Sequence, residues 1–276
     1  MPTLKISNSL RDEIRNSLEG CNSAIEAYEC LSKSESFVNI IVSIKKLLND
    51  EKYVVVSGFW GLDKSSLETF VRFFGEYYGV VEHTGIKIDC DYTGCASSSL
   101  ILHNDDAIDL ETQPNTGFIQ VIREDPVFNV SNGIVLVREL VRKLKFENKE
   151  LLEKLLRYPI PMLSYGINYE DRTKSKIITE EPVLYKKDNE YRVRFDFYRN
   201  KFYYKDANLE QLYEEAKLIY DFLSYAEQVK KNITLMKGDI LIHNNKSTLH
   251  DRGECSMEID QSGLLNTREI LVSFSR

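Results

Sequence analysis

The sequence has no CxxC pair and few cysteines, and it also lacks long apolar runs. Its five cysteines are odd in number and scattered, at Cys21, Cys30, Cys90, Cys95 and Cys255. This pattern indicates neither a zinc ribbon nor a disulfide scaffold, so we interpret the cysteines as small buried hydrophobes. The longest apolar runs, such as Val54–Val56 and Ile240–Ile242, fall far short of the ~20 residues that span a bilayer. The polar sequence after Met1 lacks the apolar core of a signal peptide, and we therefore expect a cytoplasmic protein.

An excess of basic residues is also missing. The chain of 276 residues has 36 Lys+Arg against 43 Asp+Glu, a formal charge of −7, and its pI is about 5.3. A nucleic-acid binder needs a basic face to neutralise phosphates, and docking on anionic lipid needs the same, so we expect neither partner. The hydrophobic fraction of 42% is enough for a substantial core and excludes a disordered chain.

The hydrophobic pattern predicts helices at both ends of a chain that is otherwise rich in short strands. Helical spacing covers most of residues 10–48, 67–74 after a capping Asp63, 138–157 and 209–230. The expected strands are 52–58, 79–83, 98–103, 117–122, 133–137, 176–179, 191–197, 240–243 and 268–274. Because helices do not alternate with these strands, the pattern favours a sandwich or double-sheet barrel over a doubly wound α/β sheet. We expect a mixed α/β, mainly β fold in one domain, 1–276, with residues 1–50 as a helical N-terminal extension.

The first chemically informative segment is an apolar strand that ends in His103-Asn104-Asp105. Side chains at i and i+2 of an extended segment lie on the same face, so His103 and Asp105 can converge on one metal ion. Alone, such a triplet is common and is most often solvated.

A second segment supplies the missing partner. Residues 237–245, Lys-Gly-Asp-Ile-Leu-Ile-His-Asn-Asn, form a turn and a buried strand, and His250 follows. A second histidine from a distant strand completes two histidines and one carboxylate, the facial triad of non-haem Fe(II) oxygenases. Eighteen residues after His250, Arg268 opens another strand, where a planar guanidinium can pair a carboxylate with two hydrogen bonds.

The order and spacing of these motifs resemble the TauD/clavaminate-synthase-like family of Fe(II)/2-oxoglutarate-dependent oxygenases, with a carbapenem-synthase-like layout. The resemblance runs from about Tyr53 to the C-terminus and includes a strand–glycine–helix opening at Tyr53–Phe59. It implies a double-stranded β-helix (jelly roll) with flanking helices. It further implies Fe(II) bound by His103, Asp105 and His250, and 2-oxoglutarate anchored by Arg268. The implied reaction uses O₂ and decarboxylates 2-oxoglutarate to succinate while oxidising a small-molecule substrate.

Some positions depart from the family pattern or have simpler interpretations. Many members carry a threonine near the position of Val135, so its hydroxyl is absent here or supplied elsewhere. The interval from His250 to Arg268 is long, which leaves Arg252 and Arg276 as outside candidates for the anchor.

We interpret His83 and His243 as packing or hydrogen-bonding histidines, and Trp60 as a loop aromatic that covers the core. The stretch with Tyr198, Tyr203 and Tyr204 predicts an exposed strand or insert.

The sequence says least about the substrate. Asp106, Asp109 and Glu111 follow the metal motif in a region that forms a lid in the family. They are suited to an ammonium or guanidinium group of an amino acid or amine, although a solvated acidic loop explains them equally well. Arg123, Arg192 and Arg194 are possible partners for a substrate carboxylate. Hydroxylation is the default outcome, and desaturation or cyclisation uses the same iron chemistry. Two alternatives stay open: an oxygenase that acts on a protein side chain, and a non-catalytic jelly-roll binding module.

Overall fold

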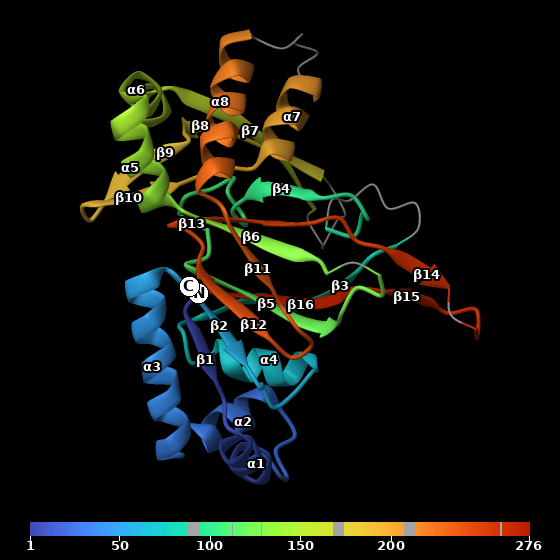
Figure 1. Cartoon of the computed structure of the whole chain (residues 1–276). Coiled ribbons are helices and arrows are strands. Elements are labelled where there is room, and N and C mark those ends of the chain that lie inside the picture. The colour runs from blue at the N-terminus through green and yellow to red at the C-terminus, as the bar shows by residue number, and fades with distance from the viewer. Residues whose placement is uncertain (88–93, 112, 128, 168–173, 207–212, 260) are drawn as a thin grey trace.

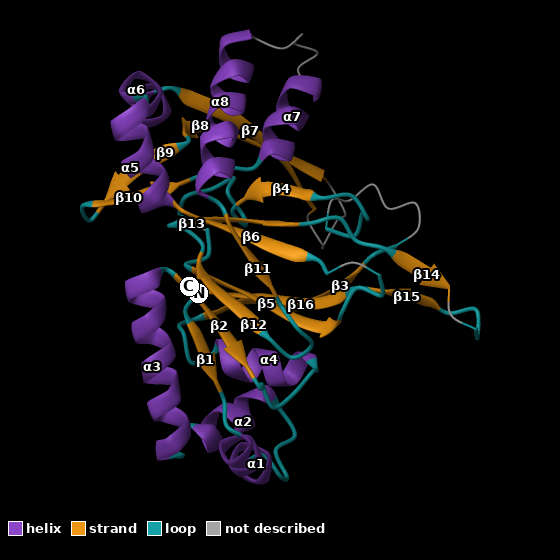
Figure 2. Cartoon of the chain, in the orientation of Figure 1, coloured by secondary structure: helices purple, strands orange, loops and turns teal. Residues whose placement is uncertain are grey.

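Two β-sheets lie face to face, with helices outside both of them (Figures 1 and 2). The computed structural model describes residues 1–276 except 88–93, 112, 128, 168–173, 207–212 and 260. The fold is mixed α/β and mainly β, as the sequence predicts. Among the described helices, none combines the length and the apolar character that a bilayer crossing requires.

The larger sheet, called here the large sheet, has six strands in the order β1-β2-β12-β5-β16-β3. Only β1 and β2 run parallel, and the other neighbours are antiparallel. Its strands are Thr3–Lys5 (β1), Tyr53–Ser57 (β2), Tyr77–Gly85 (β3), Thr116–Arg123 (β5), Ile240–Asn244 (β12) and Glu269–Ser275 (β16).

The facing sheet, called here the small sheet, is antiparallel, with four strands in the order β11-β6-β13-β4. Its strands are Leu100–His103 (β4), Ser131–Leu136 (β6), Lys231–Thr234 (β11) and Thr248–Arg252 (β13).

Alternation of side chains along the strands separates an inner core from two outer ones. Val55 and Leu241 of the large sheet pack against Ile134 of the small sheet between the layers. Val54 and Ile242, one residue away in sequence, instead face the N-terminal helices. The core residues thus show which side chains point into the space between the sheets, where a site shared by both sheets would lie.

The helices of the first seventy residues cover the outer face of the large sheet (Figure 1). Side chains cap these helices, because Ser7, Ser23, Ser34 and Asp63 each accept a hydrogen bond from a first-turn N–H. The cap at Asp63 confirms the one that the sequence predicted. These helices are Asn8–Ser17 (α1), Ala24–Leu31 (α2), Glu35–Glu51 (α3) and Lys64–Val71 (α4).

A second group of helices covers the small sheet, together with short hairpins. The helices are Val137–Glu147 (α5), Lys149–Arg157 (α6), Phe197–Asp206 (α7) and Tyr213–Val229 (α8). The remaining strands pair as β7 with β8, β9 with β10 and β14 with β15. They are Pro159–Ile167 (β7), Lys174–Pro182 (β8), Leu184–Lys187 (β9), Glu190–Val193 (β10), Met257–Ile259 (β14) and Leu265–Thr267 (β15).

The structure corrects several expectations. The helix expected over 138–157 is two helices, because Asn148 ends α5 and its Oδ1 caps α6 by accepting from Leu151 N at 3.0 Å. The strand expected over 191–197 ends at Val193. The aromatic stretch with Tyr198 and Tyr203, for which the sequence predicted an exposed strand or insert, forms helix α7. Residues 209–212 of the last expected helix lie outside the described residues.

The cysteine interpretation also needs correction. Cys95 is disulfide-bonded, whereas Cys21, Cys30 and Cys255 are free thiols. Cys90 lies outside the described residues. Of the free thiols, only Cys255 is fully buried.

Candidate metal centre

The two histidines of the predicted triad lie opposite each other on neighbouring strands of the small sheet. His103 is the last residue of β4, and its Cα pairs with that of His250 on β13. On its other side His250 pairs with Ile134 of β6, whose side chain belongs to the core between the sheets. Paired residues of adjacent strands point to the same face, so the imidazole of His250 lies on the inner face.

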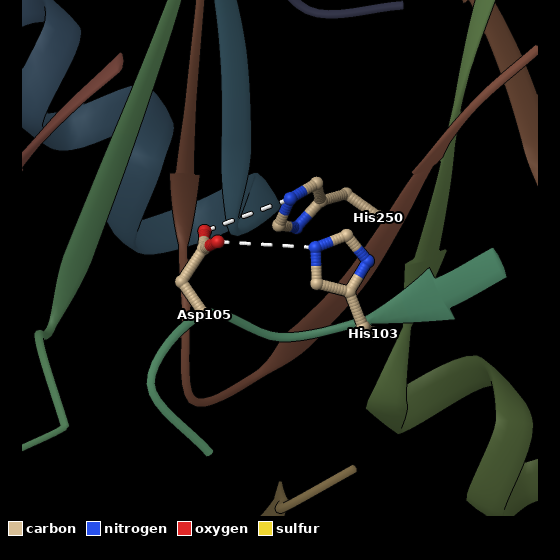
Figure 3. Close-up of side chains that lie close together, drawn as sticks. All are labelled: His103, Asp105 and His250. Carbon is tan, nitrogen blue, oxygen red and sulfur yellow. Dashed lines mark ion pairs between the residues drawn. The ribbon is translucent and has the colours of Figure 1, made fainter. Parts of the chain in front are cut away.

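Asp105 completes the cluster just beyond the end of β4 (Figure 3). Its Oδ1 lies 3.8 Å from His103 Nε2, and its Oδ2 lies 3.6 Å from His250 Nε2. The ligand atoms of His103, Asp105 and His250 all lie within 4.8 Å of one another. Metal–ligand bonds of about 2.1 Å place neighbouring ligands of an octahedral ion about 3 Å apart, so small side-chain movements bring the three atoms onto one ion.

Hydrogen bonding and burial keep both histidines suited to metal binding. His103 Nδ1 lies 2.9 Å from the carbonyl oxygen of Ile101, and a proton donated there leaves the Nε2 lone pair for a metal. Burial and the nearby His103 lower the pKa of His250 well below its usual value. A neutral imidazole is the form that binds a metal.

The polar atoms of the cluster are suited to bind a cation. Asp105 Oδ2 is buried and accepts no hydrogen bond from any described residue, although a buried carboxylate oxygen normally has a partner. A divalent ion between the three side chains would satisfy this oxygen. Two imidazole nitrogens and one carboxylate are the donor set of non-haem Fe(II) sites, which leave three positions open.

Two buried asparagines fix the backbone that carries Asp105, and the sequence analysis assigned neither a role. Asn245 Oδ1 accepts from Asp105 N at 2.9 Å, and its Nδ2 donates to the oxygens of Asp105 at 2.9 Å and Pro114 at 3.2 Å. Asn104 Oδ1 accepts from Phe195 N at 2.7 Å, and its Nδ2 donates to Val193 O and Asn245 O. Asn104 stands between the two ligands in sequence, and Asn245 closes the second motif, so both positions were visible as motif members.

His243, on β12 of the large sheet, packs against the candidate ligand His250. Its ring centroid is 4.6 Å from that of His250, and its Nδ1 lies 3.2 Å from Thr248 Oγ1. Burial and the neighbouring His250 lower the pKa of His243 to about 3, so the ring is neutral. Gly117 on the adjacent strand leaves room for it, because a Cβ there would stand 2.4 Å from His243 Nε2. The prediction of a hydrogen-bonding core histidine is confirmed.

Arg268 enters the same interior from the large sheet. It is buried, and its Nη2 donates to Asn132 Oδ1 at 3.0 Å. Asn132 precedes Ile134, the partner of His250, by two residues on β6, so both point to the inner face about 7 Å apart along the strand. No motif of the sequence marks Asn132 as a polar group of this interior, whereas Val135 faces the outer core and cannot contribute to it.

The alternative anchors have other contacts. Arg252 Nη2 donates to the carbonyl oxygens of Ala96 at 2.7 Å and Ser98 at 2.5 Å. The guanidinium of Arg276 stacks on the Tyr78 ring at 3.8 Å.

Of the three acidic residues suggested for substrate binding, Asp106 lies beside the cluster. Burial and the carboxylate of Asp105 raise the pKa of Asp106, and its Oδ1 lies 3.8 Å from Arg199 Nη2. Arg199 Nε also lies 3.2 Å from Asp196, whose backbone bridges to His103. Asp109 Oδ1 accepts from Glu111 N within a local turn, and Glu111 is exposed.

The arginines suggested for a substrate carboxylate have partners elsewhere. Arg123 pairs with Glu269, and Arg192 lies 3.2 Å from Asp188. Arg194 is fully buried and donates to the carbonyl oxygens of Ile160, Thr179 and Glu181.

The two remaining predictions concern His83 and Trp60, and both are confirmed. His83 Nε2 lies 3.1 Å from Glu269 Oε2 on the neighbouring strand. Trp60 is buried among Phe37, Phe59 and Phe70.

Comparison with known proteins identifies the family. Residues 39–261 match the family described as taurine catabolism dioxygenase TauD, TfdA family, a range that includes the three candidate ligands and ends before Arg268. Among curated proteins, no sequence matches this chain closely enough to count as a relative.

Solved structures share the fold at low sequence identity. An asparagine oxygenase in complex with Fe(II), 2S,3S-3-hydroxyasparagine and succinate is 13% identical, with a TM-score of 0.75 over 100% of this chain and 93% of that one. The non-haem iron oxygenase OrfP, in complex with Fe, succinate and (3S)-hydroxy-L-Arg, is 14% identical, with a TM-score of 0.72 over 100% and 94% of the two chains. OrfP in complex with Fe and α-ketoglutaric acid is 14% identical, with a TM-score of 0.70 over 100% of this chain and 93% of that one. The match over most of its length shows that this chain belongs to the TauD/TfdA family of dioxygenases, as the motifs indicated.

Proposed function

We propose that this protein is an Fe(II)/2-oxoglutarate-dependent dioxygenase that hydroxylates a small molecule, an amino acid or an amine-bearing metabolite. The observation that carries the proposal is the convergence of His103, Asp105 and His250 within 4.8 Å, from two strands far apart in sequence. Family membership supports the reaction class. Structural neighbours that hold iron, succinate and hydroxylated amino acids support the substrate class.

The two facing sheets are, in this proposal, a double-stranded β-helix (jelly roll) within a single oxygenase domain, 1–276. The small sheet supplies both histidines, and Arg268 directly precedes β16 of the large sheet. Residues 1–50 form an N-terminal extension in which β1 joins the edge of the large sheet, while α1, α2 and α3 pack on its outer face.

The chain's own residues have distinct roles in this scheme. Iron, when bound by His103, Asp105 and His250, supplies the site for O₂ activation coupled to decarboxylation of 2-oxoglutarate to succinate. Arg268 pairs with the distal carboxylate of 2-oxoglutarate, and Asn132 orients the guanidinium through the bond to its Nη2. Asn245 holds the backbone of Asp105 so that its carboxylate stays aimed at the histidines.

The lid that follows the metal motif is proposed to face the substrate. Asp106 is the best supported of Asp106, Asp109 and Glu111, because it directly follows the candidate ligand Asp105 in the sequence. A carboxylate so placed is suited to an ammonium group on the substrate. Hydroxylation is the default outcome of this scheme, while desaturation or cyclisation uses the same residues.

Substrate-triggered succinate release tests this function. The purified protein is incubated with Fe(II), 2-oxoglutarate and O₂, and each proteinogenic amino acid or simple amine is added in turn. We expect one substrate group to raise succinate release at least tenfold, and Asp105→Ala to abolish the increase. Activity confined to anionic substrates would contradict the role of Asp106.

Two other functions give different results in the same assay. An oxygenase acting on a protein side chain would respond to peptides and to none of the free amino acids. A non-catalytic binding module would release no succinate with any addition, and its ligand binding would survive Asp105→Ala.

A further inference from the structure

Two free thiols adjoin each other in the N-terminal helical layer, apart from the metal centre. Cys21 lies in the turn after α1, and Cys30 lies in the last turn of α2. Their Sγ atoms are 3.4 Å apart, and both residues are half-buried, so small reagents in solution can reach them. By contrast, the free thiol of Cys255 is buried and contacts the carbonyl oxygen of Gly253.

The two sulfur atoms are already close to the distance of a disulfide bond. A disulfide has an S–S length of about 2.05 Å, so the sulfurs must approach by only about 1.4 Å from 3.4 Å. The backbone already holds Cys21 in place, because its N–H donates to Leu18 O at 3.1 Å in a turn that passes through Gly20 with φ of 88°.

The two helices that such a bond would join, α1 and α2, differ in how much of their surface is buried against the rest of the protein. Helix α1 buries one residue, Ile14, and its Glu13 accepts hydrogen bonds from Ser34 and Ser36. Helix α2 buries Ala24, Ala27 and Leu31. Elements with few buried contacts open first, so a link between them would act mainly on α1.

The α2 side of the link is well anchored. The ring of Tyr28 lies 4.5 Å from that of Phe73, just beyond α4, and Thr69 Oγ1 of α4 lies 3.4 Å from Ala24 O. A bond from Cys21 to Cys30 would thus fasten α1 to a helix that is itself packed on α4.

We propose that Cys21 and Cys30 form a dithiol modification site, which hydroperoxides convert into an intramolecular disulfide that fastens the end of α1 to α2. The thiolate of one cysteine attacks the peroxide, giving a sulfenic acid and one molecule of water or alcohol. The second thiol then displaces the sulfenic oxygen as water, and the S–S bond forms. Two thiols are oxidised by two electrons, and one peroxide O–O bond is reduced.

The disulfide should stabilise the chain measurably. Closing a ring of ten residues in the unfolded chain gives a stabilisation that raises the Tm by roughly 5–10 °C for a domain of this size. Amide exchange in residues 8–21 should slow at the same time, because α1 can no longer open independently of α2.

The test uses the metal-free full chain in which Cys21 and Cys30 are reduced and the disulfide of Cys95 is intact, treated with one equivalent of hydrogen peroxide and followed by mass spectrometry of a non-reduced digest. We expect one new peptide pair that joins Cys21 to Cys30 and has lost two hydrogens, with the Tm and exchange changes above. Cys21→Ser and Cys30→Ser should each abolish the link and both changes, and Cys255→Ser should leave them intact. Each variant replaces only a thiol by a hydroxyl. The Tm of each variant before peroxide treatment, compared with that of the wild type, checks that it folds.

Two results would overturn the proposal. One is consumption of the peroxide while Cys21 and Cys30 remain alkylatable or appear as separate sulfinic acids. The other is a linked pair with unchanged Tm and unchanged exchange in α1, which would refute the fastening. Neither result depends on iron or 2-oxoglutarate, so failure here is distinguishable from failure of the oxygenase assignment.

Discussion

Replacing Asn245 with alanine is the perturbation that best tests how the fold positions the candidate ligand Asp105. The Asn245 carboxamide is fully buried and makes three hydrogen bonds, to Asp105 N, Asp105 O and Pro114 O. Each such bond contributes about 1 kcal/mol net, and each buried group left unpaired costs more. We therefore expect Asn245→Ala to lower the free energy of unfolding by about 3 kcal/mol.

The same variant should weaken iron binding. Groups that orient metal ligands typically contribute 10–100-fold in metal affinity, and Asn245 acts on the ligand Asp105 from both sides of its peptide unit. Urea denaturation and anaerobic Fe(II) titration measure the two effects. Asn232→Ala, on the exposed surface of β11, is the matched control. An unfolding free energy within 0.5 kcal/mol of the wild type (about the limit for surface substitutions) and unchanged iron affinity would refute the reasoning.

Three further predictions follow from the same interior. Gly117→Ala should lower the free energy of unfolding by about 1–3 kcal/mol and weaken iron binding, because the new Cβ would stand 2.4 Å from His243 Nε2; Gly253→Ala, whose Cβ would meet its nearest atom at 3.4 Å, should do neither. Arg268→Lys should raise the Kd for 2-oxoglutarate about 10–100-fold, since it loses the two-pronged pairing, while Fe(II) affinity stays unchanged; equal 2-oxoglutarate affinity in calorimetry would argue against Arg268 as the anchor. Below pH 6.5 the metal-free protein should lose roughly 1 kcal/mol of stability per pH unit for each histidine that the fold holds neutral, because the unfolded chain protonates these histidines. The pKa of His243 is lowered to about 3, and that of His250 is lowered well below its usual value. Denaturation of His243→Gln across this range should show a slope that is shallower by roughly 1 kcal/mol per pH unit, and an identical slope would count against the reasoning.

The sequence predicted the core elements well where a single local pattern determines them. Short apolar, β-branched runs marked the buried strands β2 and β12, and Asp63 marked the start of α4 as its cap. The HxD motif at the end of β4 predicted that His103 and Asp105 share a face, and the structure places their side chains together. These features depend on neighbours in the chain, which is why sequence alone reveals them.

Features that depend on distant partners were missed. The β13 strand, Thr248–Arg252, carries His250 and is polar, so no hydrophobic alternation marks it, although all five residues are buried between other strands. The role of Asn132 depends on its hydrogen bond with Arg268, a residue distant in sequence, so the local sequence around Asn132 does not reveal it. Helix α7 is rich in aromatic residues, for which the sequence predicted an exposed strand or insert, and it packs on the distant strand β7.

The central claim is that His103, Asp105 and His250 hold one iron ion together with 2-oxoglutarate, and anaerobic titration of the protein with Fe(II) and 2-oxoglutarate tests it most directly. The account predicts a metal-to-ligand charge-transfer band in the visible spectrum that saturates at one iron per chain and is lost in His103→Ala. A folded, iron-loaded protein that shows no such band, or a band that persists in His103→Ala, would contradict the claim.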